Sequence, residues 1–532
     1  MTHGPTESSP LLAGNPEQDH SSDRSSHKSK WRSPGRVALI IMLSVLLFCM
    51  GDQLMDGPQT RIFEAVICYR YYEEIDPTKL LVGREAVGPG AIGGVAEMFC
   101  KVDAIQSDLA ALRGWQQLFD GMPSLLLAMP MGWVADRFGR RPIILVGAVS
   151  LMIRSVWIQF VCWFWQAFDI RWIWLCGLVG GVGGGSTVLT TIVFVMISDI
   201  TEAEQRANAF LRTGAFVLCA TVVMPPLAAV LMGISPWIPT LGGTVLEFLA
   251  VVSFGLLPET LRYDHPSMPQ RAKPTEPLPA PPPPYETLPA AAVLCDSLGP
   301  SYTQSLRRWT RKVSSALAFL TDDWRVPVLL IPFLSHTLVG AIGQLILQYV
   351  SKRCQIKLSE AIYLTTIRNI VIVVLLFSIL PVISNFIMRK YSLSAQRKDL
   401  YLTRASLLIL GIGWILVGLA PNIPLVGIAL SISSLGYGSW FMLRSFIIGL
   451  IPNNRIAVVS SFLSLIDTLG FMAGSPLMAE LFSRGLALGG LWIGLPFYSL
   501  GVCGVCFAVL TLVVGLRKGE EDKDSHDVDA GQ

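Results

Sequence analysis

Charge is scarce in this sequence: only 15% of its 532 residues are Asp, Glu, Lys or Arg, against about 25% in soluble globular domains. Histidine occurs six times, and neither H-E-x-x-H nor the phosphate-binding pattern G-x-x-x-x-G-K-[ST] is present. These absences argue against a membrane metalloenzyme and a fused ATPase, so we expect no enzyme activity, no cofactor and no metal site. The net charge of +3 gives no reason to expect a nucleic-acid partner.

Long apolar runs are what the sequence has instead, since 52% of its residues are hydrophobic. A run of about 20 apolar residues crosses the hydrocarbon layer as a helix. Twelve such runs are predicted, at residues 37–57, 108–131, 142–163, 171–195, 206–233, 238–257, 326–350, 361–385, 402–420, 423–447, 456–483 and 489–516. The predicted fold class is an all-α integral membrane protein with twelve transmembrane helices.

A polar stretch at 258–325 divides the twelve runs into six and six. It contains a Pro-rich segment and is predicted to be a cytosolic linker between two six-helix bundles, at 37–257 and 326–516. Carriers built from two such repeats bind their substrate near the midplane between them. The Ser-rich tail 1–36 and the acidic tail 517–532 are expected to be disordered.

Basic residues in the short loops predict the orientation of the chain. Ten lie in the loops on one side: Arg137, Arg140, Arg141, Arg206, Arg389, Lys390, Arg397, Lys398, Arg404 and Arg455. Five lie on the other: Arg171, Lys352, Arg353, Lys357 and Arg484. Because cytoplasmic loops carry the excess of Lys and Arg, both tails are predicted to be cytosolic. We expect a multi-pass protein of the plasma membrane, with a vacuolar or endosomal membrane as the alternative.

The segment between the second and third runs, 132–142, is G-W-V-A-D-R-F-G-R-R-P. It resembles the loop G-x-x-x-D-R-x-G-R-[RK]-x of the major facilitator superfamily (MFS), whose defining positions here are Gly132, Asp136, Arg137, Gly139, Arg140 and Arg141. Any membrane helix can be followed by a basic turn, but that does not account for the acid or the two glycines, which suit a tight turn. The resemblance implies the MFS fold, with this loop bridging neighbouring helices as a conformational gate at the inner opening.

Other segments resemble a fungal branch of these facilitators, which is distantly similar to the proton-coupled folate transporter group. They are residues 64–72, 114–116, 198–199 with Arg206, and 258–260. The resemblance implies a monomeric secondary carrier that moves a small organic molecule by alternating access with proton coupling. It favours efflux of a fungal secondary metabolite or xenobiotic.

One departure keeps the direction of transport open. The pattern G-x-x-x-G-P-x-x-G-G of drug/proton antiporters is absent from residues 222–229, which have the sequence V-V-M-P-P-L-A-A. Proton-coupled uptake therefore remains an alternative. A non-transporting receptor or sensor on the same fold is the alternative from a different class.

Ionisable side chains inside apolar runs are costly and are therefore usually paired or functional. The order of helices in the facilitator fold favours these residues as cavity candidates for substrate or proton: Asp52, Asp120, His336, Arg368 and Asp467. Asp120 and Asp467 are best placed for proton coupling, and Arg368 for an anionic substrate group or for modulating such an acid. Arg154 and Glu247 are assigned to outer helices, where they pair with each other or where Arg154 pairs with Asp120. A static salt bridge is the alternative for each residue.

The fourth run is rich in glycine between residues 177 and 185. Small residues let membrane helices approach closely, so close packing against the second helix is expected, with a rocking hinge as the alternative. The predicted outer loop 58–107 contains Cys68 and Cys100, and Cys354 lies in another outer loop. One disulfide is expected among these three, and the sequence does not choose the pair.

Two short motifs lie outside the membrane runs. Glu7, Leu11 and Leu12 fit an acidic dileucine sorting signal, with chance occurrence as the alternative. In the linker, Pro282, Pro283 and Tyr285 fit the P-P-x-Y ligand of a WW-domain ubiquitin ligase. Such a segment favours extended polyproline II structure, and a plain spacer is the alternative.

Overall fold

The computed structural model describes residues 34–201, 203–260, 324–391, 395–451 and 456–514. Within these ranges the chain forms helices and loops, without a strand. Lipid offers no hydrogen-bond partner to the backbone, so an apolar segment there must satisfy its N–H and C=O groups internally, as a helix does.

The first half of the chain forms six crossings from seven α-helices. Their bounds are α2 (Pro34–Ile75), α3 (Asp103–Phe138), α4 (Arg140–Trp163), α5 (Cys176–Gly181), α6 (Gly185–Ile200), α7 (Ala203–Met232) and α8 (Trp237–Gly255). A 3-10 helix, η5 (Ile170–Leu175), leads into α5. The predicted continuous helix at 171–195 was wrong in one respect, because the crossing is broken between α5 and α6, where Gly184 has φ +78°.

The second half also forms six crossings. Its α-helices are α12 (Arg325–Cys354), α13 (Leu358–Val374), α14 (Leu380–Tyr391), α15 (Ala395–Leu419), α16 (Ile423–Leu435), α17 (Ser439–Gly449), α18 (Ile456–Leu488) and α19 (Leu495–Val513). A π-helical turn, η6 (Leu375–Ile379), joins α13 to α14, and η7 (Gly436–Gly438) joins α16 to α17. A third short helix, η9 (Gly490–Gly494), precedes α19.

Eleven of these spans are each long and apolar enough to cross a membrane. α3, which bends by 51° between Ala128 and Pro130, is the twelfth when its two parts are counted as one span. The prediction of an all-α membrane protein with twelve helices is confirmed.

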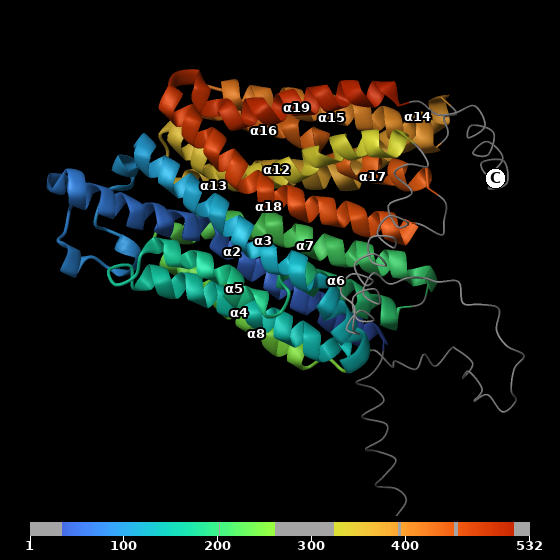
Figure 1. The fold of residues 1–532 in the computed structure, drawn as a ribbon, viewed down its shortest axis with the longest axis horizontal. Helices are drawn as coiled ribbons and strands as arrows, with labels where there is room; N and C mark the ends of the chain where they lie inside the picture. Colours follow the sequence, from blue (N-terminus) through green and yellow to red (C-terminus); the bar gives the residue numbers. More distant parts are fainter. Residues whose placement is uncertain (1–33, 202, 261–323, 392–394, 452–455, 515–532) are drawn as a thin grey trace, which may run out of the picture.

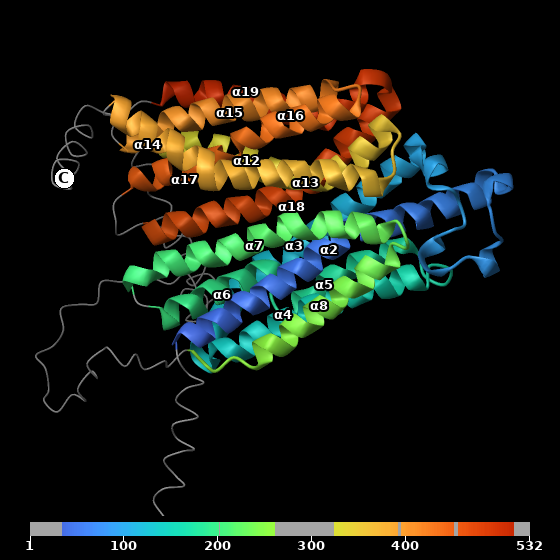
Figure 2. The same cartoon turned by 180° about the vertical axis from the view of Figure 1, so that it is seen from behind.

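The two halves form two bundles that lie side by side, one blue to green and the other yellow to red (Figures 1 and 2). Helices α3 and α7 of the first half pack against α18 and α13 of the second. Small residues bring α3 close to α18: a methyl group on Gly114 would lie only 2.9 Å from Cβ of Ala479. The interface between the halves is therefore tight at Gly114, in the first part of α3.

α2 differs most from its prediction of 37–57, because it continues to Ile75 and has 42 residues. At about 1.5 Å per residue it is about 63 Å long, twice the thickness of the hydrocarbon layer. Its second part projects beyond the other helices (blue in Figure 1). The predicted outer loop 58–107 is thus partly helix.

We call residues 76–102 the cap. It contains four short helices, η1 (Pro77–Lys79), η2 (Arg84–Ala86), η3 (Pro89–Ala91) and η4 (Glu97–Lys101). The end of the bundle that carries the cap is the cap end. The opposite end, where Gly139 joins α3 to α4, is the motif end, and α2 begins and α19 ends there (Figure 1).

The second half has an apolar core to which Ala110, Ala229 and Met232 of the first half also contribute. In the second half Tyr349, Trp414 and Phe497 are buried; Trp414 stacks on Phe497, and Tyr349 meets the same ring at an angle of 50°. The hydroxyl of Tyr349 donates to the carbonyl of Val417 at 3.0 Å, so its polar end is satisfied. Two further apolar clusters lie within the first half alone.

Candidate functional site

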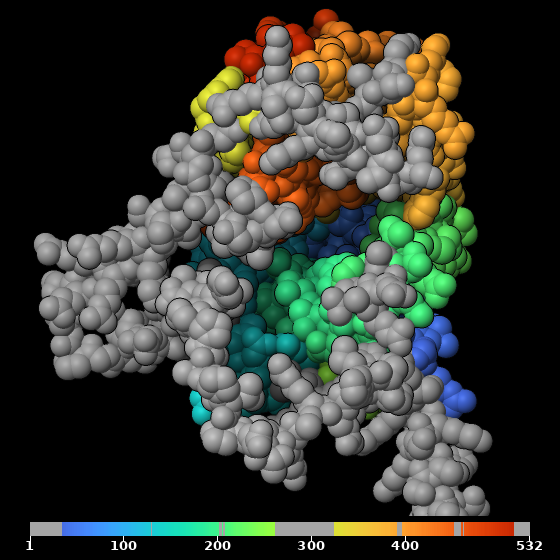
Figure 3. Space-filling model, turned by 90° about the vertical axis from the view of Figure 1, so that its right-hand side faces the viewer, coloured from blue at the N-terminus to red at the C-terminus, as the bar shows by residue number. Residues whose placement is uncertain are grey.

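A cavity of about 340 Å³ lies between the halves, near the middle of α3, α12 and α18. Helices α3 to α6 form its wall in the first half, and α12 and α18 form its wall in the second. The polar and charged side chains that line it are Gln117, Asp120, Ser124, Arg154, Ser186, Thr187, His336, Thr337, Asp467 and Thr468. Seen from the motif end, the surface has a recess between the two halves (Figure 3).

An arginine between two carboxylates forms the charged wall of the first half. Arg154 of α4 has Nη1 3.2 Å from Oδ2 of Asp120 and Nη2 3.8 Å from Oδ1 of Asp52. The thiol of Cys176 donates to the other oxygen of Asp120 at 3.1 Å. The prediction that placed Arg154 outside the cavity was wrong, because its side chain passes Gly180, where an added methyl group would lie 3.2 Å from Cδ.

Glu247 of α8 lies behind this group and is buried. The hydroxyl of Ser155 donates to its Oε1 at 3.1 Å, while Oε2 has no hydrogen-bond partner among the described residues. Of the two pairings expected for Arg154, the structure contains the one with Asp120.

A histidine and an acid form the corresponding wall of the second half. His336 of α12 has Nδ1 3.5 Å from Oδ1 of Asp467 on α18. The imidazole stacks on Trp440 at 4.6 Å between ring centroids and meets the edge of Tyr437 at 5.8 Å. Both titratable residues line the same cavity as Asp120, so ionisable groups from the two halves face one space.

The five residues predicted for the cavity divide into three groups. Asp120, His336 and Asp467 line it, and Asp52 reaches it through Arg154. Arg368 of α13 is not part of the lining; its electrostatic neighbour is Tyr437.

The motif residues connect the ends of four helices at the motif end. Arg140 contacts Asp136 one turn earlier and has Nε 3.5 Å from Oδ2 of Asp199 at the end of α6. Glu259, after α8, accepts from the backbone N–H of Arg140 at 2.8 Å and of Arg141 at 3.2 Å. These contacts bind α3 and α4 to α6 and α8, all within the first half.

The turn at the motif is tighter than predicted, because α3 continues to Phe138 and α4 begins at Arg140. Only Gly139 lies between them, with φ +110°. The expectation that both glycines belong to the turn was wrong: Gly132 is helical, and a methyl group there would meet no atom within 4 Å. Arg137 is exposed, with its guanidinium over the ring of Trp133 at 5.3 Å.

Glycines of α5 and α6 pack against α3 and α4. Gly177 lies against the backbone of Phe119, and a methyl group on Gly181 would lie 2.8 Å from Cγ of Pro123. Gly183, between the two helices, lies against Ser150. Close packing against the second helix accounts for Gly177 and Gly181, whereas Gly183 packs against the third.

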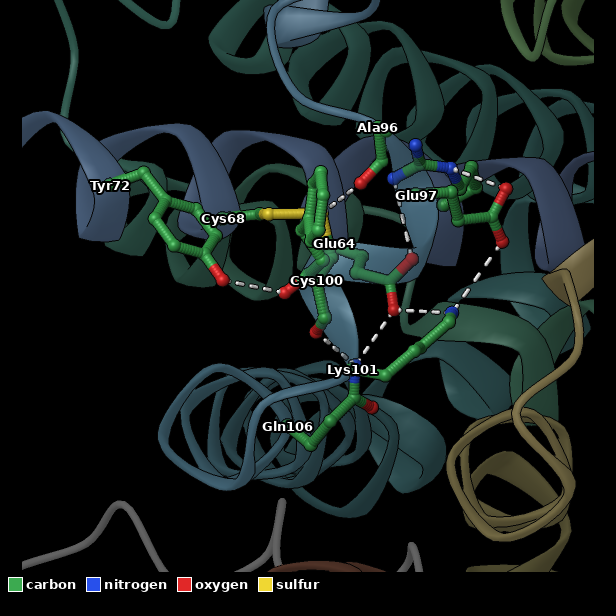
Figure 4. Close-up of a disulfide and its surroundings, with 10 residues drawn as sticks. Glu64, Cys68, Tyr72, Ala96, Glu97, Cys100, Lys101 and Gln106 are labelled. Carbon is green, nitrogen blue, oxygen red and sulfur yellow. Dashed lines mark hydrogen bonds and ion pairs between the residues drawn. A yellow bond between two sulfur atoms is a disulfide. The ribbon is translucent and has the colours of Figure 1, made fainter. Parts of the chain in front are cut away.

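At the cap end Cys68 of α2 and Cys100 of the cap form a disulfide (Figure 4), and Cys354 is a free thiol. The residues of the sorting and ubiquitin-ligase motifs, Glu7, Leu11, Leu12, Pro282, Pro283 and Tyr285, lie outside the described residues.

Polar contacts described between the halves lie toward the cap end. Ser107 donates to Ser483 at 2.8 Å, and Gln348 donates to the carbonyl of Gln106. Arg113 donates to Gln344 of the second half at 2.8 Å and to Asp56 of the first at 2.6 Å. Sequence analysis missed Arg113, although a charge near the start of a predicted span was a signal for it.

The sequence profile of the Major Facilitator Superfamily matches residues 110–475. The chain belongs to this superfamily. The facilitator is 27% identical to the efflux pump ustT of Aspergillus flavus, over 86% of this chain and 84% of that protein. It is 26% identical to the MFS efflux pump atnC of Emericella nidulans, over 92% and 89%.

Solved structures agree on the fold. The human organic anion transporter MFSD10 is 16% identical and superimposes with a TM-score of 0.51, over 90% of this chain and 99% of that one. A D-xylose-proton symporter is 13% identical with a TM-score of 0.55, over 89% and 96%. The facilitator is thus a secondary transporter of the membrane, with its two halves around a central cavity.

Proposed function

We propose that this facilitator exports a small organic molecule of the secondary-metabolite or xenobiotic class in exchange for protons. The observation that carries the proposal is the central cavity, which ionisable side chains from both halves line. The surface between the halves is hollowed at the motif end (Figure 3), where the positive-inside rule expects the cytosol. Relatives named as efflux pumps that match most of the chain support export as the direction.

Proton exchange follows from the unequal numbers of acids and cations beside the cavity. Arg154 is the cation that faces both Asp52 and Asp120. An isolated carboxylate in a low-dielectric setting is costly, so the acid that Arg154 leaves becomes the place for a proton. His336 and Asp467 form a second pair of ionisable residues on the opposite wall. Movement of Arg154 between its two acids links proton binding to helix movement.

The same proposal includes the cellular setting. The transporter acts as a monomer in the plasma membrane, with a vacuolar or endosomal membrane as the alternative. The linker motif at Pro282, Pro283 and Tyr285 recruits a WW-domain ubiquitin ligase that controls its removal. Deletion of residues 281–285 then lengthens the lifetime of the protein at the membrane, and an unchanged lifetime refutes this part.

Metabolite levels inside and outside the cell test the proposed direction of transport and identify the transported compound. In the native host, deletion of the gene should raise the intracellular level of at least one metabolite and lower it in the medium, as measured by mass spectrometry of both fractions. Reintroduction of the gene should reverse both changes. The opposite distribution, with the compound left in the medium, would show uptake.

Coupling is tested with that compound in proteoliposomes under an imposed pH gradient. We expect Asp120→Asn and Asp467→Asn each to reduce gradient-driven flux about tenfold or more, because each removes a titratable group. Exchange of labelled for unlabelled compound without a gradient should persist, since the cavity keeps its shape. Glu85→Gln, at an exposed acid of the cap, is the matched control. Full gradient-driven flux in both cavity variants would contradict the assignment.

A further inference from the structure

A buried ion cluster ties the cap to α2 (Figure 4). Glu64 of α2 accepts at one oxygen from Lys101 of the cap and from Gln106 of α3, both at 2.7 Å. Its other oxygen lies 3.3 Å from Nη1 of Arg61. The side chains of Glu64 and Lys101 are each 1% exposed, so the second part of α2 and the end of the cap form one rigid unit.

This cluster also positions Glu97, at the start of η4. Arg61 has Nε 3.2 Å from one oxygen of Glu97, and Lys101 has Nζ 3.5 Å from the other. The disulfide joins Cys100, next to Lys101, to α2. A covalent bond and two ion pairs therefore hold the carboxylate of Glu97 in place.

Glu97 then contacts the other half of the molecule. Its Oε1 accepts from the backbone N–H of Leu358 at 2.7 Å, and Leu358 is the first residue of α13. A carboxylate at a helix N-terminus satisfies a free N–H and interacts favourably with the helix dipole. The side chain of Lys357, which precedes the helix, makes no such cap, so the acid that caps α13 comes from the first half.

A second contact between the halves lies at the end of α12, just before the connection to α13. Lys352, in the last turn of α12, donates to the carbonyl of Lys101 at 2.5 Å and has Nζ 2.7 Å from Oδ1 of Asp103. The segment 97–103 thus contacts the second half both before and after the connection between α12 and α13. Both contacts are polar and cross between the halves.

We propose that the cap is the outer latch of this transporter, with Glu97 and Lys352 as the residues that position the two halves when the cap end is closed. Glu97 keeps Arg61 and Lys101 as partners when α13 moves away, so opening does not leave a bare buried charge. Opening breaks a helix cap and an ion pair near the surface, and both interactions are modest in free energy. Such a latch closes firmly and still opens in each cycle.

The disulfide gives the latch a dependence on the redox state. Without the bond between Cys68 and Cys100, η4 is held by ion pairs alone, and the position of Glu97 is less constrained. The cap end closes in each transport cycle whichever way the substrate moves, so the latch does not depend on the proposed cargo or direction.

A cross-linking assay of the full chain in membranes tests it without any substrate. Ser107→Cys and Ser483→Cys place two thiols on opposite halves, where the serine oxygens are 2.8 Å apart. A short bismaleimide links them when the cap end is closed, and mass spectrometry of the linked peptides at successive times gives the rate of cross-linking. Into this background we add Glu97→Ala, Lys352→Ala, or Cys68→Ser with Cys100→Ser, and Glu85→Ala as the matched control in the cap.

We expect Glu97→Ala and Lys352→Ala each to lower the rate of cross-linking about fivefold, as loss of one charge-assisted hydrogen bond changes a two-state equilibrium. The variant without the disulfide should cross-link more slowly than the Glu85→Ala control. Equal rates in Glu97→Ala, Lys352→Ala and Glu85→Ala would overturn the proposal. If Glu97→Ala does not reach the membrane, Lys352→Ala decides alone, because Lys352 contacts the latch without belonging to the Glu64 cluster.

Discussion

At the scale of single residues, Arg154 changes the interpretation of the cavity. Its sequence position assigns it to an outer helix, yet its guanidinium reaches the lining and lies between Asp52 and Asp120. The sequence contains Gly180, but it does not show that this glycine lies against Arg154 and leaves the space that the arginine crosses. The periodicity of the sequence predicts the face of the helix on which a side chain starts. The length of the side chain and the residues around it determine where its charged group lies.

This geometry predicts that the two acids replace each other as partners of Arg154. Asp120→Asn or Asp52→Asn alone should lower the free energy of unfolding by about 1 kcal/mol, because one carboxylate remains. The double variant should lower it by about 3 kcal/mol or more, since it leaves a cation unpaired. Thermal unfolding in detergent measures the three values. Asp108→Asn, at an exposed acid of the same helix, controls for the substitution itself, and additive effects of the two acids would contradict the prediction.

At the scale of elements, the motif shows what a sequence pattern can and cannot predict. The pattern predicts a turn with bridging charges, and the structure has Arg140 between Asp136 and Asp199. It does not predict the length of the turn, because α3 and α4 extend until a single residue separates them. That residue is Gly139, which adopts a positive φ.

The two glycines of the motif should therefore respond differently to alanine. Gly139→Ala should destabilise the protein by about 2 kcal/mol, because the backbone there is strained for an L-residue and the new methyl group meets the carboxylate of Glu259. Gly132→Ala should stabilise it by up to about 1 kcal/mol, because alanine favours a helix and finds open space. Thermal unfolding of both variants beside the native protein gives the answer. Equal shifts would show that the turn does not need a glycine.

At the scale of the whole molecule, hydropathy predicts the number of crossings because the bilayer sets the length of an apolar helix. The same argument fails for the second part of α2, since Arg61, Glu64 and Arg70 make it polar. It is helical because it packs against the cap and forms the Glu64 cluster, which are tertiary contacts. The disulfide also depends on tertiary structure. Three cysteines are predicted on the outer side of the membrane, and the sequence gives no reason to prefer one pair. The fold brings Cys68 and Cys100 together.

Alternating access predicts that a covalent bond between the halves at the cap end stops transport, whereas a bond within one half does not. Oxidation of the variant Ser107→Cys with Ser483→Cys should reduce transport of the identified metabolite at least about tenfold, because α3 and α18 can no longer separate. The matched control is Ser44→Cys with Ser253→Cys, whose native oxygens are 2.7 Å apart within the first half. It should form its bond and keep its activity. A reductant should restore the first variant, and native protein given the same reductant corrects for any effect on the bond between Cys68 and Cys100. Undiminished transport by the fully oxidised Ser107→Cys with Ser483→Cys variant would mean that the cap end does not open during the cycle.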